Sequence, residues 1–204
     1  MVNIVGLGPG SREYILPKAL ETLKKSDVIL GFDRALESLS FLSVDKKNVN
    51  SLKEVLNFID DNKNMEISII ASGDPCFYGI GEYIGKNYDG QVQTIPGISS
   101  FQYMAAKLNK AWQGSFLGSL HGREEDFLNK VKEYQLSIWL TDRKNSPDVL
   151  CRKLLEKNLN VMVYVGENLS YRDERITTGY PEELKDMQFS NLSVVIIEKV
   201  GEDQ

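Results

Sequence analysis

The sequence predicts an α/β protein of two lobes, each an open mixed sheet flanked by helices. Short apolar runs that fit strands alternate with segments of helical spacing along the first half of the chain. Three of these runs end in glycine-bearing turns, and an open α/β sheet binds its ligands beyond the carboxyl ends of its strands. The sequence changes character at 109–118, which we interpret as a linker. We therefore expect an N-terminal lobe at 1–109, a C-terminal lobe at 110–204 and a cleft between them.

The expected elements follow from hydrophobic period and turn residues. In the first lobe the short strands separated by helices imply a mostly parallel sheet that is covered on both faces. There we expect strands at 2–7, 27–30, 67–71 and 92–95, and helices at 17–24, 52–59, 81–86 and 100–108. In the second lobe we expect strands at 116–120, 137–140, 161–165 and 192–200, and helices at 124–134 and 147–157.

Composition excludes several classes of protein. The chain has 204 residues, of which 42% are hydrophobic and 26% charged, as in ordinary globular proteins. It has no apolar run near the roughly 20 residues that span a bilayer, and its N-terminus lacks the pattern of a signal peptide. We therefore expect a cytoplasmic protein. The net charge of −5 argues against a general nucleic-acid binder.

Cysteine and histidine are too few for most metal or disulfide frameworks. Cys76 and Cys151 are the two cysteines and His121 is the single histidine, so we expect no metal site. The nucleophile-elbow pattern G-x-S-x-G is absent, which argues against a serine hydrolase.

The first glycine-bearing turn is GLGPG at 6–10. It fails the dinucleotide fingerprint, because Ser11 stands where the third glycine belongs and Pro9 removes a backbone donor. Taken alone, it is most simply a tight strand-to-helix turn. Alternatively, its glycines let a bulky ligand approach the backbone.

Two further turns follow the third and fourth strands. Asp74, in SGDP at 72–75, can accept hydrogen bonds from a ribose hydroxyl or an ammonium group, or it can cap the turn. Ser99 and Ser100, in PGISS at 96–100, can cap the next helix or contact a carboxylate. Because all three turns end strands of one sheet, we expect them to line one edge together.

Basic residues and the histidine lie beside these turns or open the second lobe. His121 and Arg123 belong to SLHGR at 119–123; a lone histidine is more often structural, whereas the flanking glycine and arginine suggest an exposed loop that pairs with carboxylates. Arg34 follows the second strand, where a surface ion pair is the plainer interpretation.

The order and spacing of the three turns resemble the tetrapyrrole methyltransferases that use S-adenosylmethionine. In that family GxGPG ends the first strand, GDP follows the third and a PGxSS-like turn follows the fourth; the match covers essentially the whole chain. SLHGR at 119–123, LTD at 140–142 and VGENLSYRDERI at 165–176 are similar to the CbiE branch, which methylates C5 of the corrin macrocycle in cobalamin biosynthesis. In some organisms that module is fused to a decarboxylating C15-methyltransferase, and here we expect the C5 module alone.

The resemblance implies a set of site residues. The cofactor S-adenosylmethionine would fold between the lobes, and the GPG turn would face the macrocycle. Many relatives have an acidic residue and proline where this chain has Arg12-Glu13, and this departure concerns the macrocycle side. The implied cofactor contacts are Leu7, Gly73, Asp74, Phe77, Ser99, Ser100, Leu140, Thr141, Gly166 and Ser193. The expected substrate contacts are Gly8, Pro9, Gly10, Arg12, Arg34 and Arg123.

Methyl transfer depends mainly on how the methyl donor and the acceptor carbon are positioned. A sulfonium is already an activated methyl donor, and a reduced corrin precursor offers enamine-like carbons, so holding the two in line lowers the barrier. We expect no single essential catalyst; His121 can take up a proton after transfer. Arginines suit the carboxylates of the macrocycle. The family is usually homodimeric, and a separate CbiT-type C15 enzyme is a possible partner.

Three alternatives stay open from the sequence. The same fold serves methyltransferases that act at other corrin positions, on uroporphyrinogen, on a modified histidine or on ribosomal RNA, although the acidic balance speaks against RNA. A corrinoid- or nucleotide-binding module without catalysis would bind ligand and transfer no methyl group. A purely structural domain would gain no thermal stability from any ligand.

Overall fold

The computed structural model describes residues 1–123, 125–191 and 193–201, and at residues 33 and 34 it describes the backbone alone. Contacts divide the chain into two units, Met1–Ser100 and Phe101–Gln204. The sequence places the boundary at 109/110. The helix α5 (Ser100–Lys107) accounts for the difference, because Lys107 forms an ion pair with Glu174 in the second unit. The lobe bounds of 1–109 and 110–204 stay a prediction.

The first unit is built on a parallel sheet with the strand order β3-β2-β4-β1-β5. Every one of its pairings is parallel, so the expected mostly parallel sheet is confirmed, whereas a mixed sheet is wrong for this unit. Helices follow most of its strands and return the chain to the opposite end, which is what parallel pairing requires. Its strands are β1 (Val2–Gly6), β2 (Val28–Gly31), β3 (Asp45–Asn48), β4 (Ile67–Ala71) and β5 (Val92–Ile95).

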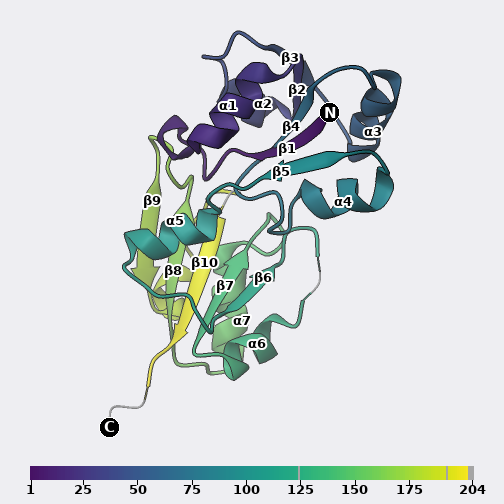
Figure 1. The fold of residues 1–204 in the computed structure, drawn as a ribbon. Helices are drawn as coiled ribbons and strands as arrows, with labels where there is room; N and C mark the ends of the chain where they lie inside the picture. The colour runs from purple at the N-terminus through teal and green to yellow at the C-terminus, as the bar shows by residue number, and fades with distance from the viewer. Residues whose placement is uncertain (124, 192, 202–204) are drawn as a thin grey trace. The chain divides into compact units, whose positions relative to one another are not determined.

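Helices cover both faces of this sheet, as expected (Figure 1). On one face, Leu23 and Leu39 pack with Ile29 in an apolar cluster. On the other, Val55 and Ile84 belong to a second cluster that includes strand residues such as Ile4 and Leu30. The covering helices are α1 (Pro17–Lys25), α2 (Asp33–Glu37), α3 (Leu52–Asp61) and α4 (Ile80–Asn87), and a short 3-10 turn (Arg12–Tyr14) follows β1.

The second unit has a mixed sheet with the order β6-β7-β10-β8-β9, as expected. The pair β6–β7 is parallel, and β10 runs antiparallel to both of its neighbours. Trp139 and Val195 lie in a core that α6, α7 and α8 cover, while α5 contacts the opposite face. The elements are β6 (Phe116–Ser119), α6 (Phe127–Glu133), β7 (Leu136–Leu140), α7 (Pro147–Glu156), β8 (Val161–Glu167), β9 (Arg175–Gly179), α8 (Pro181–Leu184) and β10 (Ser193–Lys199).

Five elements were not expected from the sequence, namely the 3-10 turn Arg12–Tyr14, α2, β3, β9 and α8. The strands β3 and β9 lie at sheet edges and carry polar residues, so neither shows an apolar run. The helix α8 has only four residues, which is too short for a helical pattern of apolar residues to repeat. The strand β6 begins inside the expected linker, at Phe116. Glu124 and Leu192, where a helix and a strand were expected to begin, lie outside the described residues.

Within the described ranges, no helix is long and apolar enough to cross a membrane.

Candidate active site

The turns after β1 and β4 meet at the carboxyl edge of the first sheet. Gly8 and Gly73 exchange two backbone hydrogen bonds, with N···O distances of 3.2 Å and 2.8 Å. Both have a positive φ, +79° and +66°, a conformation that residues with a Cβ atom rarely adopt. The glycines therefore make the crossing of these two turns possible.

The turn after β5 joins the same edge through Gly97. A Cβ atom at Gly97 would lie 2.1 Å from the carbonyl oxygen of Gly73 and 2.9 Å from the carbonyl carbon of Gly6. Only glycine fits so close to two other backbones. The expectation that the three turns at 6–10, 72–75 and 96–100 line one edge together is confirmed.

Asp74 ties these turns together. Its Oδ1 accepts a hydrogen bond from the N–H of Cys76 at 2.8 Å, and its Oδ2 accepts one from the N–H of Gly97 at 3.1 Å. The turn-capping interpretation of Asp74 thus describes these bonds. An ionised carboxylate has about four acceptor sites, so each oxygen can still accept a hydrogen bond from a ligand.

The remaining candidates of the first unit surround this edge. Leu7 donates its N–H to Ala71 at 2.9 Å, and both Leu7 and Ser99 are buried. Phe77 is half-buried beside Tyr78, and Ser100 begins α5. Pro9 and Gly10 complete the first turn.

Two arginines of the first unit were expected to contact the substrate. The guanidinium of Arg12 is exposed and stacks over the ring of Phe41, 4.0 Å from its centroid. Arg34 belongs to α2, directly after β2, and its side chain lies outside what the structure describes.

In the second unit, the candidates gather at one edge of the mixed sheet. Leu140 ends β7 and Ser193 begins β10, while Gly166 is paired with Val194 near the end of β8. Thr141 donates through both its N–H and its hydroxyl to the carbonyl oxygen of Ser193, at 3.3 Å and 2.9 Å. Antiparallel pairing therefore brings Leu140, Thr141, Gly166 and Ser193 together.

A Cβ atom at Gly166 would lie 2.8 Å from both the Leu169 Cδ2 and the Met104 Sδ. The glycine thus permits α5 and the loop after β8 to pack close to this edge.

His121 lies at this same edge, in the loop after β6. Its Nδ1 is 3.4 Å from the carbonyl oxygen of Thr141, and its side chain is exposed. Only an Nδ1 that carries a hydrogen can donate to a carbonyl, so of the two tautomers this contact favours the one whose Nε2 is the acceptor.

Asp142, which follows Thr141, holds the His121 loop. Its Oδ2 accepts a hydrogen bond from the N–H of Gly122 at 2.9 Å, and its Oδ1 accepts from the N–H groups of Asn145 at 2.8 Å and Lys144 at 2.9 Å. The hydrogen bonds from Gly122 and Asn145 lower the pKa of Asp142 from its usual value. Sequence reasoning noted the LTD triplet but gave Asp142 no role.

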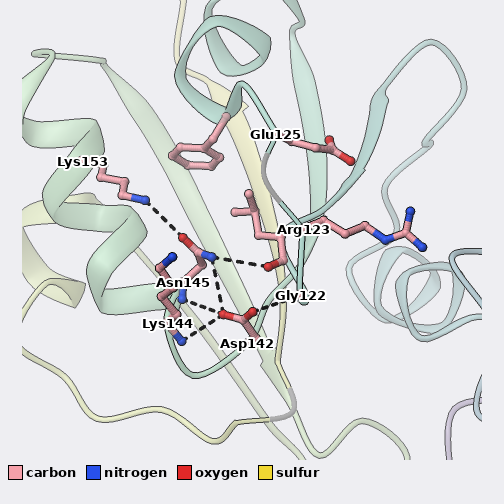
Figure 2. A pocket seen from close by; sticks show the side chains of 9 residues that line it. Gly122, Arg123, Glu125, Asp142, Lys144, Asn145 and Lys153 are labelled. Carbon is pink, nitrogen blue, oxygen red and sulfur yellow. Dashed lines mark hydrogen bonds between the residues drawn. The ribbon is translucent and has the colours of Figure 1, made fainter. Parts of the chain in front are cut away.

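A basic pocket of about 610 Å³ opens beside this loop (Figure 2). Lys153 donates to the Asn145 Oδ1 at 3.2 Å, and Arg123 points away from that cluster on the other side of the pocket. The two lysines of the pocket were missed, although Lys144 in DRKN lies two residues after Asp142, the last residue of the LTD triplet. The lining residues are Leu120, Gly122, Arg123, Glu125, Phe127, Asp142, Lys144, Asn145 and Lys153.

Solved structures share this fold over nearly the whole chain. The precorrin-6Y methylase (CbiE) of Archaeoglobus fulgidus superposes with a TM-score of 0.77 at 24% identity and covers 98% of this chain and 99% of its own. The uroporphyrin-III C-methyltransferase of Thermus thermophilus, complexed with S-adenosylhomocysteine, has a TM-score of 0.79 at 20% identity, over 97% of this chain and 91% of its own. These likenesses show the fold class of the chain, an α/β protein with two five-stranded sheets.

The family is shown by sequence. The model of the tetrapyrrole (corrin/porphyrin) methylases matches residues 1–185, and the chain belongs to this family, whose methyl donor is S-adenosylmethionine. A probable cobalt-precorrin-7 C(5)-methyltransferase of Methanocaldococcus jannaschii is 33% identical over 97% of this chain and 98% of its own. The cobalt-precorrin-7 C(5)-methyltransferase of Salmonella typhimurium is 31% identical over 86% of this chain and 89% of its own.

Proposed function

We propose that this protein transfers a methyl group from S-adenosylmethionine to C5 of cobalt-precorrin-7, or of the related metal-free precorrin, in cobalamin biosynthesis. The observation that carries the proposal is the near full-length likeness to the C(5)-methyltransferase of M. jannaschii, at 33% identity. A relative named for C(20) methylation is also matched over 96% of this chain, but at 26% identity. The C5 assignment is therefore the better supported one.

The edge of the first unit suits an adenosylmethionine. The donor is a nucleoside with hydroxyl groups and an ammonium group, and the free acceptor sites of Asp74 match both. Gly73 has no Cβ atom that would hold a ligand away from the backbone of this turn. The proposed cofactor contacts in this unit are Leu7, Gly73, Asp74, Phe77, Ser99 and Ser100.

In the second unit, we propose cofactor contacts at the edge of the mixed sheet. Thr141 and Ser193 use their side chains within the edge itself, through the bonds Thr141 Oγ1 to Ser193 O and Ser193 Oγ to Ser190 O at 2.6 Å. Their role is thus to shape the edge as much as to touch a ligand. The proposed contacts are Leu140, Thr141, Gly166 and Ser193.

The substrate carries many carboxylates, and basic side chains can bind them. Arginine grips a carboxylate with two parallel hydrogen bonds, and lysine adds a point charge. The turn residues Gly8, Pro9 and Gly10 are proposed to face the macrocycle. The proposed basic contacts are Arg12, Arg34 and Arg123, joined by Lys144 and Lys153 of the basic pocket.

S-adenosylmethionine supplies the electrophilic methyl group, and the chain supplies placement. The glycine-lined turns fix where each reactant sits, which removes entropic cost from the barrier. His121 holds its Nδ1 against the carbonyl of Thr141, so its Nε2 is the atom that can take a proton released after transfer. The expected effect of His121 is modest, because the substrate carbon is itself nucleophilic.

Further proposals concern assembly. We propose a homodimer, as is usual in this family, and a separate CbiT-type enzyme for the C15 step. The cytoplasmic location expected from the sequence stays a prediction.

Anaerobic incubation with ¹³C-methyl adenosylmethionine tests the proposed function. The substrates are the cobalt and metal-free forms of precorrin-7, and carbon NMR locates the new methyl. We expect a single label at C5. A label at another carbon would assign a different corrin position, and tight binding without transfer would indicate a non-catalytic binding module.

A further inference from the structure

The carboxylate of Glu167, the last residue of β8, is almost fully buried. Its side chain is 4% exposed, yet it pairs with Arg175, whose side chain is 50% exposed. Its Oε2 accepts a hydrogen bond from the Arg175 Nε, and its Oε1 accepts one from the backbone N–H of Ser190 at 2.7 Å. A buried carboxylate is costly unless its acceptors are used, and here both oxygens are.

This pair holds the segment 188–190, which precedes β10 in the chain. The second arm of the Arg175 guanidinium donates to the carbonyl oxygen of Gln188 at 2.9 Å, while Glu167 holds Ser190. The hydrogen bond to Glu167 also raises the pKa of Arg175. Two side chains thus fix the backbone of this segment at two points.

From Ser190, hydrogen bonds continue to the candidate cofactor edge. The carbonyl oxygen of Ser190 accepts from the hydroxyl of Ser193 at 2.6 Å, and the carbonyl oxygen of Ser193 accepts from the hydroxyl of Thr141 at 2.9 Å. The carbonyl oxygen of Thr141 is in turn the contact of the His121 imidazole. Glu167 is therefore connected to Ser193 through two successive hydrogen bonds, and to Thr141 through three.

The loop that follows Glu167 is fastened to the same segment. Asn168 has a positive φ of 46°, and its Oδ1 accepts a hydrogen bond from the Ser190 hydroxyl at 3.3 Å. Its Nδ2 donates to Asp173 at 2.9 Å, across the loop. The backbone at Gly166, directly before Glu167, is thus held through both the loop after β8 and the segment 188–190.

We infer that Glu167 is a positioning residue, which with Arg175 sets the geometry of Thr141, Gly166 and Ser193 for cofactor binding. This inference rests on the proposed function, since it concerns the edge at which the cofactor is proposed to bind. Glu167 itself is buried behind that edge and has both oxygens engaged within the protein, so it acts through other residues.

The substitution Glu167→Gln tests this role. An amide has one acceptor oxygen, so either Arg175 or Ser190 loses its partner while size and shape are kept. We expect the Kd of S-adenosylhomocysteine, measured by titration calorimetry, to rise about tenfold, the effect of losing roughly one charge-assisted hydrogen bond. The KM for adenosylmethionine should rise by a similar factor, and kcat at saturating cofactor should change less than about threefold.

Glu198→Gln is the matched control. Glu198 lies at the other end of β10, and its Oε2 accepts from the Lys110 Nζ at 2.6 Å and from the Tyr164 hydroxyl at 2.9 Å. The substitution therefore removes the charge of a partly buried pair at the opposite end of β10, while the amide oxygen can still accept both hydrogen bonds. We expect a smaller loss of thermal stability than in Glu167→Gln and a Kd for S-adenosylhomocysteine within about twofold of the unchanged protein.

The outcomes separate the inference from the proposed function. Equal Kd values for Glu167→Gln and the unchanged protein, or equal weakening by both substitutions, would overturn the positioning role. An unchanged protein that binds no S-adenosylhomocysteine would instead refute the proposed function, and the inference with it. If Glu167→Gln does not fold, Arg175→Lys carries the test: it keeps the charge but cannot reach both Glu167 and Gln188, so an intermediate Kd is expected.

Discussion

The carboxylate of Asp74 accepts a hydrogen bond from the backbone N–H of Gly97 at 3.1 Å, although these residues belong to turns after different strands. Its other oxygen holds the N–H of Cys76 within its own turn. One side chain thus fixes the turn after β4 to the turn after β5. The edge proposed to bind the cofactor depends on this link.

Replacing Asp74 with alanine should remove the link between the turns after β4 and β5 and weaken cofactor binding. The N–H groups of Cys76 and of the half-buried Gly97 would lose their acceptor, and the ligand would lose the carboxylate. We expect the Kd of S-adenosylhomocysteine to rise at least about tenfold by calorimetry, equivalent to about 1.4 kcal/mol. Binding of the macrocycle should change little. An unaltered cofactor Kd would remove Asp74 from the site.

Replacing Gly97 with alanine should destabilise the first unit. The new Cβ would lie 2.1 Å from the carbonyl oxygen of Gly73, which is backbone and cannot turn aside. Overpacking of this kind costs about 1–3 kcal/mol or more. Urea unfolding measures the change in the free energy of unfolding.

Gly85→Ala is the control for this experiment, because nothing lies within 4 Å of a Cβ there. Gly85 belongs to α4, where alanine is favoured over glycine by about 0.5–1 kcal/mol. We expect this variant to be as stable as the unchanged protein or slightly more so. A Gly97→Ala protein of equal stability would contradict the close approach of the three turns.

The fold was largely predictable because buried strands are visible in the sequence as short apolar runs. The buried runs at β1, β4 and β10 stand out in the sequence, and each was expected within two residues of its observed bounds. The edge strand β3 was missed because its residues, DKKN, are polar and mostly exposed. Such a strand is defined by its pairing with β2, which a local pattern does not encode.

The site was predictable where backbone geometry demands glycine. Gly8, Gly73 and Gly97 mark turns whose φ or close contacts tolerate no side chain, so the residue type itself points to the edge. Residues that act through contacts distant in sequence could not be found. Glu167 reaches Ser190 across 23 positions, and no local pattern links the two.

Replacing Arg123 with alanine should weaken binding of the macrocycle and leave cofactor binding nearly unchanged. Arg123 is exposed at the basic pocket, and each charge-assisted pair with a carboxylate contributes about 1–3 kcal/mol. We expect the KM for the corrin substrate to rise about five- to fiftyfold. Lys153→Met should act in the same direction.

Arg152→Ala controls for the loss of a positive charge in this unit. Its guanidinium is paired with Asp148 at 2.9 Å and lies 3.6 Å from Asp186, and it does not line the pocket. The KM for the corrin substrate should therefore stay within about twofold, since an exposed pair contributes little. If Arg123→Ala weakened cofactor and substrate equally, Arg123 would not be a contact specific to the macrocycle.

Replacing Asp142 with asparagine should reduce stability at neutral pH and remove part of its acid dependence. Hydrogen bonds from Gly122 and Asn145 hold the folded pKa of Asp142 below the ordinary value of 3.8. The stabilisation is therefore fully present above that ordinary value and is lost as the pH falls through the lower, folded pKa.

Unfolding by urea at pH 7 and at steps from pH 5 to 2.5 measures the free energy of unfolding of both proteins. We expect the unchanged protein to be more stable by about 1–2 kcal/mol at pH 7 and the difference to shrink as the pH falls below 4, since asparagine does not titrate. The loop that carries His121 should also loosen, because Gly122 loses its charged acceptor. A difference in stability that is the same at every pH would mean that the charge of Asp142 does not hold this loop.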